Sequence, residues 1–243
     1  MKPIFCRIGS KIFSADNIIE YFPEHDVYVE PFVGSGSVFF KKEKVKTEVL
    51  NDLDKDLVNS YKLLKSVTEQ QFESFKMLKT LQQKRDFVNS SPTTTAGKLY
   101  KRLLLSCNTF SSKGKGKLYK NFNHFSKIKN IEDYKKRLKN TKILNQDYKN
   151  ILKKYDSPNT LFYLDPPYEN SKGLYDKYEM DYEDLEKQVR NLKGAVAISM
   201  NDSPNIRKIF KNYKIVKIKE RRSNRIGDKF TARDDILIMN YTF

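Results

Sequence analysis

Apolar positions divide the chain into three parts, two with strand-and-helix patterning and one between them with helical patterning only. Near the amino terminus, Asp26–Phe40 is typical of a short strand, a glycine-containing turn and the start of a helix, and Thr47–Leu50 predicts a second strand. Apolar residues then recur at helical spacing at Leu53, Leu57, Tyr61 and Leu64. This alternation of strands and helices predicts a parallel sheet with helical crossovers.

The same pattern returns near residue 141. Thr141–Tyr148 and Asn159–Tyr168 each resemble a strand that ends at an acid, and Tyr182–Leu192 predicts an amphipathic helix. Three further strands are predicted at Gly194–Asp202, Tyr213–Lys219 and Asp234–Thr242. The last two follow each other without a helix between them, which favours an antiparallel pair at the end of a mixed sheet.

The middle of the chain has amphipathic helical stretches, such as Phe72–Leu81 and Lys98–Leu105, but little strand character. Its second half is rich in Lys and Arg, and from Lys98 to Lys142 the only acids are Glu132 and Asp133. We therefore expect residues 1–64 and 141–243 to form one α/β domain. Residues 65–140 are expected to form a basic, mainly helical insertion.

The charge of the whole chain favours a polyanionic partner. The 243 residues include 47 Lys and Arg against 30 Asp and Glu, a formal charge of +17. Nucleic acid fits this charge best and an anionic membrane surface second. The alternative is that lysine fills tolerant surface positions for compositional reasons, which explains the average charge better than its clustering.

Cysteine and histidine are too few to build a disulfide framework or a metal centre. Cys6 and Cys107 have no partner at a useful spacing, and the two histidines, His25 and His124, suggest no metal site. The amino terminus lacks a signal-peptide pattern, and no stretch is long and apolar enough to span a membrane. These features predict a reducing, cytoplasmic location and no membrane partner.

Four polar features fall at the predicted carboxyl ends of strands, where ligands of such sheets bind. These features are Glu30 with the glycine turn, Asp52, Asp147 and Asp165. Gly34 and Gly36 allow a tight turn and a close approach of backbone to ligand, although a plain strand-to-helix turn also fits. Asp52 suits either a ribose diol or the N-cap of the next helix. Together, the turn and the acid predict a nucleoside-bearing cofactor, and no P-loop motif is present.

The tetrad Asp165–Tyr168 predicts chemistry on a nucleobase amine. Such an amine is a poor nucleophile because its lone pair is delocalised into the ring. A carboxylate from Asp165 and a fixed carbonyl from Pro166 could accept its two N–H bonds and free the lone pair, while Tyr168 supports a base removed from its stack. The alternative is an ordinary turn after a strand, since Asp-Pro is a common turn dipeptide.

These motifs resemble those of the Dam-type DNA adenine-N6 methyltransferases, which use S-adenosylmethionine. The resemblance rests on RIGSK (Arg7–Lys11), EPFVGSGSVF (Glu30–Phe39), LNDLDKDLV (Leu50–Val58) and LFYLDPPY (Leu161–Tyr168), in the family order. It implies a doubly wound class I methyltransferase fold, related to the Rossmann fold, and a DNA-recognition role for the insertion. The family usually has Trp where this chain has Arg7.

The resemblance also implies residue roles. Catalysis would fall to Asp165, Pro166, Pro167 and Tyr168. The cofactor would be held by Arg7, Gly9, Lys11, Glu30, Pro31, Phe32, Gly34, Ser35, Gly36, Ser37, Asp52, Asp147, Tyr148 and Asp165. In the family, methyl transfer is direct and needs no metal.

The target-recognition signature of the family survives only in part, so we assign no base-reading residues. Phosphate contacts are predicted at Lys113, Lys115, Lys117, Lys120, Arg221 and Arg222, with a solvated loop as the alternative for the lysines.

The sequence therefore predicts a site-specific enzyme that methylates N6 of a flipped adenine in double-stranded DNA. A cytosine-N4 or RNA amino-methyltransferase is the nearest alternative, and a non-catalytic nucleic-acid-binding module is the second. We expect a monomer in solution, with a dimer on DNA and a cognate restriction endonuclease as open questions.

Overall fold

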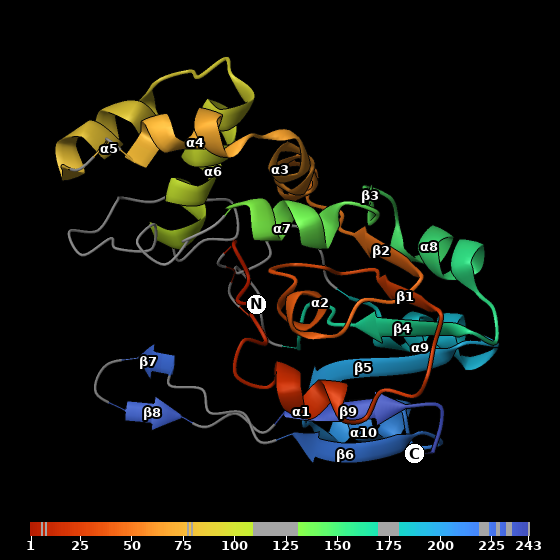
Figure 1. Cartoon of the computed structure of the whole chain (residues 1–243). Coiled ribbons are helices and arrows are strands. Elements are labelled where there is room, and N and C mark those ends of the chain that lie inside the picture. The colour runs from red at the N-terminus through yellow and green to blue at the C-terminus, as the bar shows by residue number, and fades with distance from the viewer. Residues whose placement is uncertain are drawn as a thin grey trace.

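A computed structural model arranges the chain around one seven-stranded sheet (Figure 1). The structure describes residues 1–5, 7, 9–76, 78, 80–108, 131–169, 180–218, 224–226, 229–231 and 235–242. The strands of this sheet are β1 (Val27–Glu30), β2 (Thr47–Asn51), β3 (Lys142–Leu144), β4 (Thr160–Leu164), β5 (Ala195–Asn201), β6 (Lys214–Ile218) and β9 (Asp235–Met239).

The strand order β3-β2-β1-β4-β5-β9-β6 confirms the doubly wound methyltransferase sheet predicted from the sequence. Neighbouring strands from β3 to β5 are parallel, whereas β9 pairs antiparallel with both β5 and β6. The predicted antiparallel pair at the carboxyl terminus is therefore confirmed. Because β9 runs against the other strands, its first residue lies at the edge where the parallel strands end.

Alternate residues of the central strands face two separate cores. On β4, Leu161 and Tyr163 belong to one core and Phe162 and Leu164 to the other, and the whole strand is buried. Helices α1 (Ala15–Ile19), α2 (Ser37–Lys41) and α3 (Lys55–Ser66) supply the first core, and α8 (Tyr148–Tyr155), α9 (Tyr182–Arg190) and α10 (Pro204–Ile209) supply the second. Burial on both faces explains why these strands are continuous apolar runs rather than alternating ones.

The first helix after β2 begins later than the sequence pattern suggested. Asp54 is the N-cap of α3, and its side chain accepts hydrogen bonds from the backbone N–H groups of Asp56 and Leu57. Leu53 lies before this cap and is 45% exposed. The inclusion of Leu53 in the helical pattern with Leu57, Tyr61 and Leu64 was therefore wrong, because the cap and not the apolar spacing sets the start.

The described part of the inserted region is helical, as predicted, but its helices have different limits. The stretch Phe72–Leu81 is not one helix: α4 (Glu69–Lys76) ends, and Thr80 forms a capping box with Gln83 that starts α5 (Leu81–Asn89). These helices pack on α6 (Thr95–Asn108) through stacked rings, with 4.9 Å between the centroids of Phe75 and Tyr100.

The predicted insertion takes in the end of one helix and the whole of another that pack against the core of the sheet. Helix α3 continues past residue 64 to Ser66, and α7 (Ile131–Leu138) buries Tyr134 and Leu138 in the same core as β1. Arg137 of α7 also forms an ion pair with the buried Glu48 of β2. The division at 65 and 140 stays a prediction, but α7 packs with the α/β domain.

Two further segments differ from the sequence prediction. Thr141–Tyr148 is a strand only over β3, because Asp147 caps α8 and Tyr148 is its first residue. Between β6 and β9, where the sequence analysis expects no strand, lies a short antiparallel pair, β7 (Asn224–Ile226) and β8 (Lys229–Thr231). No helix in the described ranges has the length and apolar character needed to cross a membrane.

Candidate active site

The amino-terminal segment and the carboxyl ends of β1, β2 and β4 meet at one side of the sheet. In Figure 1 the red segment after the amino terminus lies on the side to which the arrowheads of β4 and β5 point. Lys11 of this segment contacts Asp165, which directly follows β4, with 2.7 Å between Nζ and Oδ1. The structure thus joins the RIGSK and DPPY motifs, which are far apart in sequence.

The glycine turn after β1 leaves an open stretch of backbone. Gly34 and Gly36 adopt left-handed conformations, with φ of +48° and +67°. A Cβ built on Gly34 meets no atom within 4 Å, whereas one on Gly36 would lie 3.0 Å from the hydroxyl of Tyr61. Gly34 therefore faces free space that a ligand can enter, and Gly36 allows close packing beneath the turn.

Asp52 binds the glycine turn from the end of the neighbouring strand. Its two carboxylate oxygens accept hydrogen bonds from the backbone N–H groups of Gly34, at 2.9 Å, and Asp54, also at 2.9 Å. Burial raises the pKa of Asp52 above its usual value, against the lowering effects of Arg7 and these two N–H groups. Because Asp54 is the helix cap, the N-cap alternative for Asp52 is excluded, and its remaining lone pairs lie beside the open turn.

Arg7 is held at the next acid along the chain. Its guanidinium forms a 2.7 Å ion pair with Asp54, and Arg102 of α6 lies 3.7 Å from the same carboxylate oxygen. Burial opposes ionisation of Asp54, but the hydrogen bond and charge of Arg7 outweigh it and lower the pKa. Arg7 thus fixes the amino-terminal segment beside Asp52 and links it, through Asp54, to the inserted helices.

Three serines connect the two glycine-containing segments. Ser10 lies 2.8 Å from Ser37 and accepts a 3.0 Å hydrogen bond from Ser35, measured between hydroxyl oxygens. Gly9, with φ of +84°, offers its carbonyl to the Lys11 ammonium at 3.1 Å. Ser10 is not among the predicted cofactor residues, although its place between Gly9 and Lys11 in the motif was a signal for it.

The DPPY tetrad surrounds a buried cation. The Lys11 ammonium, 3% exposed, lies 4.7 Å from the ring centroid of Tyr168. The Tyr168 hydroxyl donates a 2.9 Å hydrogen bond to Asp235, a residue outside every predicted site. Pro167 uses its carbonyl to accept a 2.8 Å hydrogen bond from Tyr182, and no donor to the Pro166 carbonyl occurs among the described residues. A contact between the Pro166 carbonyl and a substrate amine stays a prediction.

An aromatic pair flanks the turn on its other side. The rings of Phe32 and Tyr148 lie 5.2 Å apart between centroids with a 36° tilt. The hydroxyl of Tyr148 donates to Asp184 at 3.1 Å, while the Asp147 side chain caps α8. Phe32 and Tyr148 thus offer apolar faces for a planar ring, and Asp147 lies next to them at the helix start.

Glu30 and Pro31, which precede the turn, are hydrogen-bonded to neighbouring parts of the protein. The buried Glu30 carboxyl accepts hydrogen bonds from the Tyr28 hydroxyl, at 2.5 Å, and the Phe39 N–H, at 3.0 Å. The carbonyl of Pro31 accepts a hydrogen bond from Asn51, which also binds the backbone of Gln146. The structure therefore places Glu30 inside the strand–turn–helix unit, and a direct contact between Glu30 and a ligand stays a prediction.

The predicted DNA contacts cannot be placed in the same way. Lys113, Lys115, Lys117, Lys120, Arg221 and Arg222 all lie outside the described residues.

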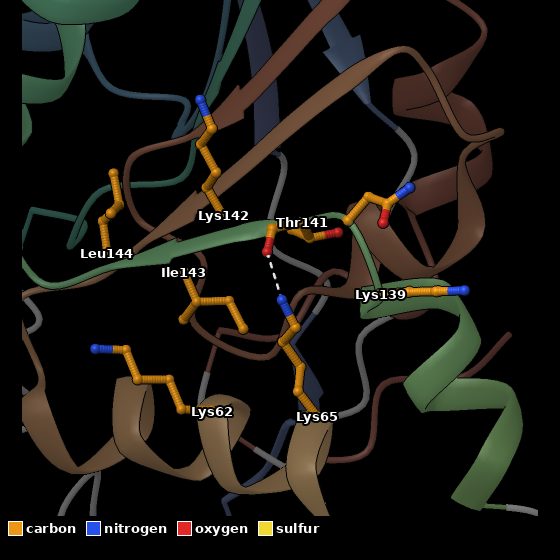
Figure 2. Close-up of a pocket in the computed structure, with 8 residues that line it drawn as sticks. Lys62, Lys65, Lys139, Thr141, Lys142, Ile143 and Leu144 are labelled. Carbon is orange, nitrogen blue, oxygen red and sulfur yellow. Dashed lines mark hydrogen bonds between the residues drawn. The ribbon is translucent and has the colours of Figure 1, made fainter.

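A basic hollow of about 580 Å³ lies along edge strand β3 and contains none of the predicted site residues. Figure 2 shows Lys62, Lys65, Lys139 and Lys142 around it, with the Lys65 ammonium donating to the carbonyl of Thr141. Lysines at an exposed sheet edge discourage pairing with another strand, which accounts for this cluster without a ligand.

Comparison with known proteins agrees with the geometry. Residues 8–224 match the D12 class N6 adenine-specific DNA methyltransferase family. The chain is 26% identical to the Type II methyltransferase M.MjaIII of Methanocaldococcus jannaschii, over 99% of both chains. It is 24% identical to the Type II methyltransferase M.CviBI of Paramecium bursaria Chlorella virus NC1A, over 99% of this chain and 100% of the relative.

Proposed function

The chain belongs to the D12 class N6 adenine-specific DNA methyltransferase family, and we propose that it methylates one adenine within a specific sequence of duplex DNA. The activity itself follows from the family: the protein is an S-adenosylmethionine-dependent DNA adenine-N6 methyltransferase. The proposal concerns which residues act and what they recognise. The observation that carries it is the Lys11–Asp165–Tyr168 cluster at the strand ends, next to the open glycine turn.

The residues around the turn fit S-adenosylmethionine. The free space above Gly34 admits the cofactor close to backbone, and the Asp52 carboxylate beside it suits the two ribose hydroxyls. Phe32 and Tyr148 suit the adenine ring, since their own rings form a tilted pair at the edge of the turn. When bound, the cofactor supplies a methyl group on a positively charged sulfur.

Asp165 and Pro166 act on the target amine in this proposal. One N–H of the amine donates to the Asp165 carboxylate and the other to the Pro166 carbonyl, which draws the nitrogen toward tetrahedral geometry. The lone pair would then be available to form a bond to the methyl carbon as its bond to the sulfonium breaks and S-adenosylhomocysteine leaves. The Asp165 carboxylate would accept the proton that the nitrogen releases. Lys11, 2.7 Å from Asp165, holds that carboxylate in place.

Tyr168 supplies the surface for the flipped base. Its hydroxyl donates to Asp235 at 2.9 Å, which holds the ring beside the Lys11 ammonium. An aromatic face stacks on any base and contributes roughly 1–3 kcal/mol. Stacking therefore offsets part of the cost of extracting the adenine from the duplex.

Sequence recognition and assembly form the remaining part of the proposal. We assign recognition to the helical insertion and the basic segments at 109–130 and 219–234, because a charge of +17 and their lysines and arginines suit a DNA backbone. The Type II names of the full-length relatives support pairing with a cognate restriction endonuclease. A monomer that methylates one strand at a time fits the single site described above.

The test is incubation of the protein with methyl-labelled S-adenosylmethionine and duplex DNA, followed by digestion to nucleosides and sequence mapping. We expect label in N6-methyldeoxyadenosine at one short sequence. Label spread over all adenines would refute the specificity, and label confined to RNA or to N4-methylcytosine would refute the target. Asp165→Ala should abolish transfer while leaving DNA affinity, and a fully active variant would remove Asp165 from the mechanism.

A further inference from the structure

Asp235 lies beside the catalytic tetrad although it belongs to none of the predicted motifs. It is the first residue of β9, is 1% exposed, and accepts a 2.9 Å hydrogen bond from the Tyr168 hydroxyl on Oδ2. The Lys11 ammonium lies 3.9 Å from the same oxygen. Buried carboxylates are rare unless paired, so both partners are needed to explain this one.

The direction of β9 explains how this residue reaches the site. The register pairs Asp235 with Asn201, the last residue of β5, and with Ile218, the last residue of β6. Since β9 runs antiparallel to both, its beginning lies at the same edge of the sheet as the end of β4, where Asp165 follows. The first residue of β9 therefore lies at the same edge of the sheet as the residues that follow the parallel strands.

Lys11 connects the two carboxylates. Its ammonium is 2.7 Å from Asp165, 3.9 Å from Asp235 and 4.7 Å from the centroid of the Tyr168 ring that Asp235 anchors. One buried ammonium cannot fully neutralise the charges of two carboxylates. A change at Asp235 therefore alters how strongly Lys11 binds Asp165. Burial, together with these carboxylates, also raises the pKa of the Tyr168 hydroxyl well above its usual value, so the hydroxyl stays a donor.

We propose that Asp235 is a positioning residue for the target base: it holds the hydroxyl end of the Tyr168 ring in place and shares Lys11 with Asp165. The ligand concerned is a purine base flipped out of duplex DNA, so the inference rests on the proposed function. Asp235 does not touch the reacting atoms, and its effect passes through Tyr168 and Lys11. Loss of Asp235 should therefore weaken base capture and the chemical step more than cofactor binding.

The experiment compares Asp235→Ala, Asp235→Asn, Tyr168→Phe and the double variant Asp235→Ala with Tyr168→Phe. A duplex with 2-aminopurine at the mapped target adenine reports extraction and stacking of the base through its fluorescence. The turnover number is measured at saturating DNA and cofactor, and the cofactor Kd by calorimetry. Ser199→Ala, which removes a buried hydroxyl on β5 that contacts Tyr163 and not the tetrad, controls for general loss of stability.

We expect Asp235→Ala to lower kcat by about tenfold or more and to change the 2-aminopurine signal, because one buried hydrogen bond and a share of an ion pair are lost. Tyr168→Phe should reproduce part of this loss, and the double variant should be less impaired than independent effects predict. Asp235→Asn, which retains an acceptor for Tyr168, should recover the fluorescence signal more fully than the rate.

Wild-type kcat and fluorescence in a folded Asp235→Ala protein would overturn the inference, as would fully additive effects in the double variant. Equal losses in Asp235→Ala and Ser199→Ala would also overturn it. If the wild-type protein itself fails to methylate duplex DNA, the proposed function fails instead, so the two results are separable.

Discussion

The ammonium of Lys11 lies 2.7 Å from a carboxylate oxygen of Asp165, although the two residues are 154 positions apart in the chain. Lys11 is almost fully buried, and its ammonium also donates to the backbone carbonyl of Gly9 at 3.1 Å. The contact brings the amino-terminal segment against the catalytic tetrad. The position of Asp165 therefore depends on where Lys11 lies.

Replacement of Lys11 by Met should therefore impair catalysis more than it impairs folding. The Asp165 carboxylate, 22% exposed, loses its 2.7 Å ion pair. A hydrogen bond to a charged group contributes roughly 1.5–3 kcal/mol, which corresponds to a loss of about tenfold to a hundredfold in kcat. Single-turnover methylation assays measure this. The matched control is Lys41→Met, because Lys41 pairs with Asp16 at the surface and such pairs contribute little. Equal activity of the two variants would contradict the assignment.

Asp52→Asn should weaken S-adenosylmethionine binding without a matching effect on DNA binding. The amide keeps one acceptor oxygen, so it cannot serve Gly34, Asp54 and two ribose hydroxyls together. Loss of one or two such hydrogen bonds raises the cofactor Kd by about tenfold. Calorimetry with cofactor and fluorescence anisotropy with DNA separate the two effects. Asp56→Asn, a change at an exposed residue in the first turn of α3, should leave the Kd for cofactor and the Kd for DNA unchanged.

The sequence predicted the sheet and the glycine turn after β1 well because these depend on local patterns. Apolar runs locate β1, β4 and β5, and Gly34, Asp52 and Asp165 follow strands whose ends must meet at one edge. It could not show that Asp54 caps α3 in place of Asp52, since both acids suit an N-cap. Asp235 was missed for a different reason. It lies near the tetrad only because β9 is antiparallel to β5, and strand direction leaves no motif in the sequence around the residue.

The two glycines of the turn should respond differently to alanine. Both have positive φ, so either change costs about 1 kcal/mol in backbone strain. At Gly36 the new Cβ would also lie 3.0 Å from the Tyr61 hydroxyl and 3.2 Å from the Phe40 ring, whereas at Gly34 it would meet open space. We expect Gly36→Ala to lower the free energy of unfolding more, and Gly34→Ala to raise the cofactor Kd with less loss of stability. Denaturant melts and calorimetry check this, and a reversed ranking would show that Gly34 does not face the cofactor.

Glu30 should make stability depend on pH in the neutral range. Burial raises its pKa from an ordinary 4.5 to about 8, against the lowering effect of its hydrogen bonds from Tyr28 and Phe39. A carboxyl with a raised pKa in the folded state contributes fully to stability below its unfolded pKa, and that contribution is lost as the pH rises toward the folded value. The free energy of unfolding should thus fall between about pH 4.5 and pH 8, by up to about 1.4 kcal/mol per pH unit from this group alone.

Glu30→Gln isolates this effect, because the amide imitates the neutral carboxyl and its oxygen can still accept from Tyr28 and Phe39. We expect the variant to gain stability relative to the wild type as the pH rises through this window, and the difference to level off above about pH 8. Urea melts at closely spaced pH values measure it. Glu43→Gln, a change at an exposed carboxylate, should give a curve parallel to that of the wild type. A parallel curve for Glu30→Gln as well would mean that the Glu30 carboxyl is ionised inside the fold, and that its two donors stabilise an anion beneath the cofactor turn.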